Sequence, residues 1–241
     1  DLLQASDTYF KSLGPHKFGC LMLLLPEDVA KQITDWVIEN IDDSHLAPEG
    51  RELRPHITVT YGFSDDDSVL EVLKPLLART GPIVVKLTGL SLFKVGYGKW
   101  NGEDGGDVLH ATVESPQLTG LHHAIAGAFP LPGEKHPTYI PHITLAYLRP
   151  EASNLYEEEH PPFLGQVLDL TLAEYSSPDG NREQIPLSFL PVLGFNEKAM
   201  SAINLPFGED AGVGVTYPSP YLTKPHHTSP LHTKPHPTSP D

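Results

Sequence analysis

The stretch Pro55-His56-Ile57-Thr58-Val59-Thr60-Tyr61 returns later in the chain, with two changes, as Pro141-His142-Ile143-Thr144-Leu145-Ala146-Tyr147. Five of the seven positions are identical and a sixth is apolar in both copies, which indicates an internal repeat. Both copies alternate in polarity and are rich in β-branched residues, as strands are. Because residues i and i+2 of a strand project from the same face, each copy is predicted to present a His/Thr pair on one face of a sheet.

Two such strands lying side by side would bring together two imidazoles and two hydroxyls, from His56, Thr58, His142 and Thr144. This set suits in-line displacement at a phosphate: one neutral His takes a proton from the attacking hydroxyl or water, and the other, protonated, gives one to the leaving oxygen. Each Thr can donate a hydrogen bond to a non-bridging oxygen. We therefore expect no metal and no other cofactor. The competing interpretation is a strand that is used twice for packing alone.

Strand and helix patterns alternate over roughly the first 190 residues, with a polar loop between the first helix and the first motif strand. Strands are predicted at 18–25, 57–61, 83–94, 108–114 and 143–147, with a closing hairpin of 167–175 and 183–187. Helices are predicted at 27–41, from about 64 to 78, and at 118–129. This mixture predicts an α+β fold.

The strand alternation also assigns faces to the other motif residues. His56, Thr58 and Thr60 are expected to share one face, and Tyr61 the opposite one. Tyr61 and its counterpart Tyr147 are therefore expected to pack in the core.

Three residues outside the repeat are candidates for substrate contact. Trp100, on a Gly-rich loop between strands, could stack on a nucleobase or only pin its loop. Glu174, on a late strand, could reach a base edge or be a solvated strand-end carboxylate. Lys17, like Lys99 and Arg54, lies near the predicted site strands in sequence and could offset phosphate charge, although a surface role is the usual one.

Composition argues against several classes of function. The formal net charge is −15, whereas a protein that coats duplex nucleic acid needs a basic face, so we expect no duplex partner. Cys20 is the one cysteine, which allows no internal disulfide and no cysteine-based zinc site and favours a cytoplasmic location. No apolar run approaches the length of about 20 residues of a membrane helix, and no signal-peptide pattern is present, so we expect no membrane association.

The C-terminal part of the chain has a different character. From about residue 191 the hydrophobic periodicity fades, and Thr223-Lys224-Pro225-His226 is echoed by Thr233-Lys234-Pro235-His236. Such a Pro/Thr/Ser/His repeat cannot bury enough apolar surface to fold. We predict one folded domain over 1–192 and a disordered tail or linker over 193–241. The start at Asp1 rather than Met suggests a processed chain or a piece of a longer protein.

The two His-x-Thr strands lie 86 residues apart and each is followed by an aromatic residue, an arrangement that resembles the two-histidine (2H) phosphoesterases. That superfamily includes RNA ligase-like cyclic phosphodiesterases. The resemblance covers about residues 15–190 and implies a bilobal fold, with two pseudo-symmetric halves of antiparallel sheet flanked by helices and a cleft between them. Together with the two motifs, the strings Gly19-Cys20-Leu21-Met22, Ser91-Leu92-Phe93 and Val113-Glu114-Ser115 most resemble the phage anti-CBASS nucleases.

Those nucleases degrade the cyclic di- and trinucleotide messengers of bacterial antiphage immunity. The resemblance implies metal-independent cleavage of a 3′–5′ phosphodiester by His56, Thr58, His142 and Thr144, in the cytoplasm of a bacterial host. The tail departs from compact members of the family, which suggests a linker to another module of a larger phage protein. Two alternatives stay open. One is an RNA 2′,3′-cyclic phosphodiesterase, against which the acidic body argues mildly. The other is a non-catalytic module that binds a cyclic nucleotide, against which the intact His/Thr pairs argue.

Overall fold

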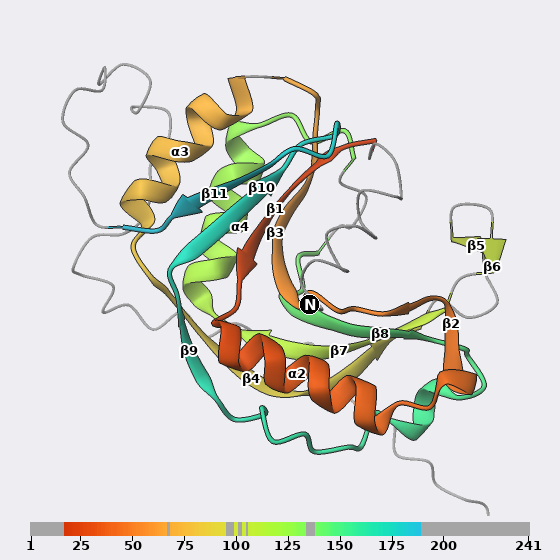
Figure 1. The fold of residues 1–241 in the computed structure, drawn as a ribbon. Helices are drawn as coiled ribbons and strands as arrows, with labels where there is room; N and C mark the ends of the chain where they lie inside the picture. The colour runs from red at the N-terminus through yellow and green to blue at the C-terminus, as the bar shows by residue number, and fades with distance from the viewer. Residues whose placement is uncertain are drawn as a thin grey trace, which may run out of the picture. The chain divides into compact units, whose positions relative to one another are not determined.

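The two motif strands are neighbours in the middle of a curled sheet in the computed structural model (Figure 1). Strand β3 (His56–Phe63) runs antiparallel to β8 (His142–Leu148), with Ile57 opposite Ile143. Three further strands follow on the β3 side and three on the β8 side. The repeated heptapeptides thus lie where the two halves of the sheet meet.

The structure describes residues 17–66, 68–94, 99–100, 103–104, 106–133 and 138–188, and the side chains of 99–104 are outside the description. Within these ranges every strand pair is antiparallel. The main sheet has the order β11 (Arg182–Pro186), β10 (Leu172–Ser176), β1 (Gly19–Leu24), β3, β8, β7 (Asp107–Glu114), β4 (Ile83–Phe93), β9 (Val167–Leu170). Strands β5 (Lys99–Trp100) and β6 (Glu103–Asp104) pair separately. The predicted tail, 193–241, lies outside the described residues.

The predicted α+β class is confirmed, and the two halves share one continuous sheet because the motif strands pair with each other. The expectation of a plain polar loop before β3 was wrong. The polar loop before β3 contains a 3₁₀ turn, η1 (Asp43–His45), and an edge strand, β2 (Leu46–Arg51), which pairs with β8. Pro48 and Gly50, the latter at φ +74°, interrupt the alternation by which a strand is recognised.

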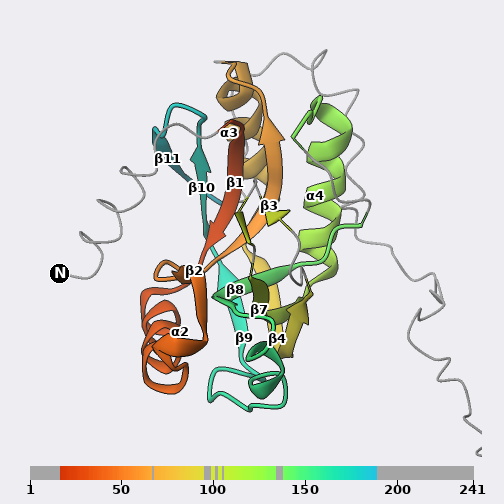
Figure 2. The same cartoon turned by 90° about the vertical axis from the view of Figure 1, so that its right-hand side faces the viewer.

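In each half of the sheet, one helix packs against a motif strand of the other half (Figures 1 and 2). Helix α2 (Glu27–Asn40) follows β1 but packs against β8 of the other half. Helix α4 (Pro116–Ala128) follows β7 and packs against β3 of the other half as well as β4 of its own. The start of α4 is fixed by Ser115, whose hydroxyl accepts a hydrogen bond from the Leu118 amide. Helix α3 (Ser68–Thr80) packs against β11. None of the helices in the described part is long and apolar enough to cross a membrane.

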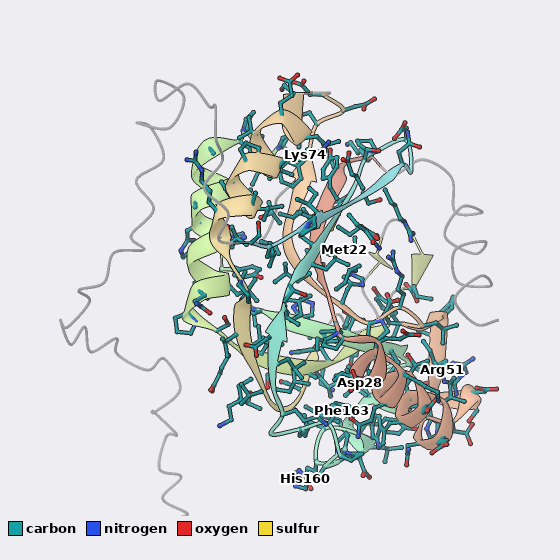
Figure 3. The ribbon with its side chains drawn as sticks, turned by 60° about the vertical axis from the view of Figure 1, so that its left-hand side comes forward. Met22, Asp28, Arg51, Lys74, His160 and Phe163 are labelled. Carbon is teal, nitrogen blue, oxygen red and sulfur yellow. The ribbon has the colours of Figure 1, made fainter. Side chains whose placement is uncertain are left out.

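The core lies on the helix-covered side of the sheet. Ile57 and Ile143 are fully buried there, between the histidine and threonine of each motif. Under α2, Trp36 meets Phe163 edge to face at 5.8 Å between ring centroids; Phe163 is labelled in Figure 3. It comes from the segment between the short turn η2 (Ser153–Leu155) and β9. Because the isoleucines point into this core, the motif histidines and threonines point to the other side of the sheet.

Each motif strand contains a β-bulge at the same motif position, the residue after the threonine. On β3 the register passes from Thr58 opposite Met22 to Thr60 opposite Leu21, which leaves Val59 as the extra residue. On β8 it passes from Thr144 opposite His110 to Ala146 opposite Leu109, which leaves Leu145 as the extra residue. The bulge is therefore part of the repeated unit.

The bulge inverts the faces that simple alternation assigns beyond it. Thr60, expected beside His56 and Thr58, is 1% exposed in the core. Tyr61, expected in the core, is 39% exposed on the motif side, so that prediction was wrong. Tyr147 is half-buried, and burial raises its pKa to about 12.

Candidate active site

The four motif side chains lie on one face of two paired strands. His56, Thr58, His142 and Thr144 are all half-buried, in contrast to the fully buried isoleucines between them. Continued by one residue on each side of the Ile57–Ile143 pair, the antiparallel register places His56 opposite Thr144 and Thr58 opposite His142. The two histidines are then diagonal neighbours, a relation in which residues lie about 7–8 Å apart. That separation leaves room for a phosphate between the two imidazoles.

Both histidines are held in the same way by their own strands. Nδ1 of His56 donates to the carbonyl of Arg54 at 2.8 Å, and Nδ1 of His142 donates to the carbonyl of Ile140 at 2.7 Å. Because a carbonyl only accepts, these bonds place the proton of each neutral ring on Nδ1. Nε2 is therefore the basic nitrogen of both rings. Each can take a proton when its ring is neutral or give one when its ring is charged.

Two neighbours fix the strand around Thr58. The hydroxyl of Tyr139 donates to the Thr58 carbonyl at 2.8 Å, and the Cys20 thiol is hydrogen-bonded to the Thr58 side chain. Burial, reinforced by the charge of Glu174, raises the pKa of Cys20 to about 12 even though the bond to Thr58 opposes the shift. Cys20 thus stays a neutral thiol at neutral pH, hydrogen-bonded to the Thr58 side chain.

A buried ion pair lies beside the first motif. Glu174 on β10 is 2% exposed and receives two hydrogen bonds from Arg54, at 2.6 and 2.5 Å. Burial raises the pKa of Glu174, but the hydrogen bonds and charge of Arg54, with Arg182 at 3.9 Å, outweigh it and hold the pKa below its usual value. The alternative of a solvated carboxylate is therefore wrong. The carbonyl of Arg54 is also the group that anchors His56.

The other two substrate-contact candidates are Lys17, near the end of β3, and Trp100, on β5. Lys17 is exposed, with Nζ 5.3 Å from the centroid of the Phe18 ring. Phe18 in turn meets Tyr61 edge to face at 6.0 Å, which brings Lys17 to the Tyr61 end of β3. Trp100 belongs by its backbone to β5, opposite Glu103, and its side chain lies outside the described part of the chain.

Sequence reasoning missed two aromatic rings that contact His142. Phe93, at the end of β4, lies edge to face with His142 at 4.9 Å and stacks on His110 at 3.9 Å. His110, on β7, meets His142 at 5.3 Å. A signal was present, since His110-Ala111-Thr112 is a third His-x-Thr sequence. It was missed because it lacks the proline and tyrosine that frame the other two.

The chemistry of the site follows from its own side chains. Over the described residues, no three His, Cys, Asp or Glu side chains are grouped so that they could hold a metal ion. Two half-buried imidazoles whose basic nitrogen is Nε2, each on the same face as a threonine hydroxyl, can supply both proton transfers and hydrogen bonds to a phosphate. These elements define a two-histidine phosphoesterase, a class of phosphodiesterases.

The family described as the 2′-5′ RNA ligase superfamily matches residues 25–179, well over half of the chain. The chain belongs to this superfamily, and the RNA ligase-like resemblance of the two motifs is confirmed.

Several solved structures are similar to this one. They include TT0787 of Thermus thermophilus (18% identity, 70% of this chain and 97% of that one, TM-score 0.46) and E. coli LigT complexed with phosphate (18%, 73% and 96%, 0.43). Usb1 of Kluyveromyces marxianus has 13% identity over 72% of this chain and 99% of its own, with a TM-score of 0.49. No curated protein matches the sequence.

Proposed function

We propose that this chain is a metal-independent phosphodiesterase that hydrolyses 3′–5′ bonds of cyclic di- or trinucleotide messengers, and that a phage uses it to counter CBASS defence in the cytoplasm of its bacterial host. The observation that carries the catalytic part is the matched pair of Nδ1 bonds of His56 and His142. They give two equivalent imidazoles the same tautomer on one face of paired strands. An acid and a base can then act from the two sides of one phosphate.

In the proposed hydrolysis a water molecule attacks phosphorus in line with the bond that breaks. Nε2 of one motif histidine takes the proton of the attacking oxygen as the new P–O bond forms. Nε2 of the other gives its proton to the leaving oxygen as the old P–O bond breaks. Thr58 and Thr144 donate hydrogen bonds to the non-bridging oxygens, where charge develops. The step leaves the first histidine protonated and the second neutral, and proton exchange with water restores both for the next turnover.

The charge of the chain supports a small substrate. A long polyanion would approach a protein of net charge −15 unfavourably, whereas a cyclic di- or trinucleotide carries only two or three phosphates. Arg54 and Arg182 lie at the site, but the buried Glu174 offsets their charge. We propose Lys17 and Trp100 as the contacts that take up phosphate charge and a base. Glu174, which is 2% exposed and bound by Arg54 through both carboxylate oxygens, sets the charge beside the first motif instead of reaching a base edge.

A second candidate is cleavage of RNA ends with a 2′,3′-cyclic phosphate. The match to the 2′-5′ RNA ligase superfamily favours it, and the same His/Thr pairs could carry it out. A third is binding of a cyclic nucleotide without turnover.

One experiment separates the three. The full chain is incubated in EDTA with a panel of cyclic dinucleotides, cyclic trinucleotides and RNA ending in a 2′,3′-cyclic phosphate, and the products are resolved by chromatography. The proposal predicts linear products from at least one cyclic dinucleotide or trinucleotide. Turnover of the RNA ends alone supports the second candidate. Binding measured by calorimetry, with no product, supports the third.

A further inference from the structure

The third His-x-Thr sequence lies directly beside the second motif. On β7, His110 is the register partner of Thr144, and Thr112 is the register partner of His142. Nδ1 of His110 points to the carbonyl of Val108 at 3.3 Å, two residues earlier in the chain, as the motif histidines do. His110 thus repeats the local geometry of His56 and His142 on the next strand.

The surroundings of His110 prevent it from touching a substrate. It is 2% exposed, and the Phe93 ring covers it in a nearly parallel stack, at 3.9 Å and 16°. The same two rings meet His142 steeply, Phe93 at 84° and His110 at 68°. Phe93 and His110 therefore form an aromatic wall against which the His142 ring stands, while its Nδ1 is tied to Ile140.

The aromatic wall carries no charge near neutral pH, because His110 is neutral there. Burial, followed by the charge of His142, lowers the pKa of His110 to about 4. Among the described residues, His142 faces it from β8, and Ser91 and Phe93 face it from β4. Lys94 and Asp107, the charged residues at that end of the two strands, pair with each other at 3.3 Å.

Among the described residues, the other half of the sheet has no aromatic ring at the matching place. Met22, on β1, is the register partner of Thr58, just as His110 is the register partner of Thr144. Met22 is 8% exposed, and Figure 3 shows where it lies on β1. One motif thus has a rigid neutral ring beside it, and the other has a flexible thioether.

We propose, on the basis of the phosphodiesterase site above, that His110 is a positioning residue: its flat ring, stacked on Phe93, holds the plane of the His142 ring and thereby keeps the Nδ1 bond to Ile140 that sets the tautomer. What matters is the ring and not a proton on it. Because a displaced acid or base reacts poorly, loss of the wall slows the reaction without weakening binding.

The test uses three variants of the full chain. His110→Ala removes the wall, His110→Phe keeps a flat ring, and Met22→Ala makes a matched truncation in the other half. We expect His110→Ala to lower kcat roughly 10- to 100-fold, with little change in KM. His110→Phe and Met22→Ala should stay within about threefold of wild type.

Nitrogen-15 NMR of the imidazoles gives a readout that does not depend on turnover. In the wild type and in His110→Phe, His142 should show the Nδ1–H tautomer when neutral. In His110→Ala it should show a mixture. If the chain cleaves nothing on the panel, the proposed function fails, yet this tautomer comparison still decides the present proposal.

Three outcomes overturn the proposal. One is a His110→Ala protein with the wild-type tautomer and kcat. The second is a folded His110→Phe protein as slow as His110→Ala, which would give the imidazole a chemical role. The third is an equal loss in Met22→Ala, which would make the effect one of packing in general. If circular dichroism shows His110→Ala to be unfolded, Phe93→Leu takes its place, because it removes the other ring of the stack. The same changes in kcat and in the His142 tautomer are then expected of Phe93→Leu, and their absence overturns the proposal.

Discussion

Ile57 and Ile143 are register partners at the centre of the sheet, and each is the middle residue of one of the two paired His-x-Thr motifs. Both side chains are fully buried in the core, so the residues on either side of them turn to the opposite face. One apolar pair thereby fixes the positions of two histidines and two threonines. The approximate two-fold symmetry of the site is a consequence of this pairing.

The threonines of the motifs should contribute through their hydroxyls. Thr58→Val and Thr144→Val keep the side-chain shape but remove a hydrogen bond to a charged oxygen, worth about 1.5–3 kcal/mol. We expect each to lower kcat roughly 10- to 100-fold. Thr60→Val is the control, because the bulge turns this third threonine into the core. A similar loss of kcat in Thr60→Val would contradict the assignment.

Thr60 should be replaceable without loss of stability. Its hydroxyl is buried and finds no hydrogen-bond partner in the described part of the chain, so Thr60→Val should leave the free energy of unfolding unchanged or raise it by about 1 kcal/mol. Thr34→Val is the contrast, since the Thr34 hydroxyl donates to the carbonyl of Ala30 at 2.9 Å. Urea unfolding of both variants checks this. A greater loss in Thr60→Val than in Thr34→Val would count against the bulge as described.

The buried ion pair should make stability depend on pH. Because Arg54 holds the pKa of Glu174 below its usual 4.5, the pair contributes stability above that value and loses it as the pH falls through the lower, folded pKa. Glu174→Gln leaves Arg54 without its carboxylate and should cost about 3–5 kcal/mol near neutral pH.

Urea unfolding at several pH values tests this. The difference between wild type and Glu174→Gln should shrink as the pH falls below 4.5. Glu183→Gln, in a surface pair with Lys74, should cost less than about 1 kcal/mol. A difference for Glu174→Gln that is the same at all pH values would rule out a charged Glu174 as its source.

The C-terminal segment should be dispensable for catalysis. Truncation after about Leu193 leaves every described strand and both His/Thr pairs intact, so kcat/KM should change by no more than a few-fold. The alternative is a clamp in which Tyr217 or Tyr221 stacks on a base. A large rise in KM with unchanged thermal stability would support the clamp and contradict the linker prediction.

The repeated heptapeptide predicted the site because strand alternation and residue chemistry are both local properties. The α+β class followed from the same kind of pattern. The exposure of Tyr61 could not be predicted, because one extra residue at Val59 inverts the faces and a bulge has no mark in the pattern here. The pairing of Glu174 with Arg54 joins residues 120 positions apart, which single-sequence periodicity cannot detect.

His110 shows a different limit. Its His-x-Thr sequence was visible, but its importance depends on β7 lying next to β8 and on the stack with Phe93 from β4. Strand order is set by tertiary packing, so the wall beside His142 became apparent only in the fold.

The central claim is that His56 and His142 act as an acid–base pair at one phosphate. The most direct measurement is kcat of His56→Ala and of His142→Ala, in EDTA, on the substrate that the wild-type chain cleaves fastest. His123→Ala, at an exposed position on α4, is the control. The account predicts that each motif variant loses roughly 10²–10⁴-fold with unchanged circular dichroism, while the control keeps wild-type activity. Near-normal kcat in either folded motif variant, or loss of wild-type activity in EDTA with rescue by a divalent ion, would contradict it.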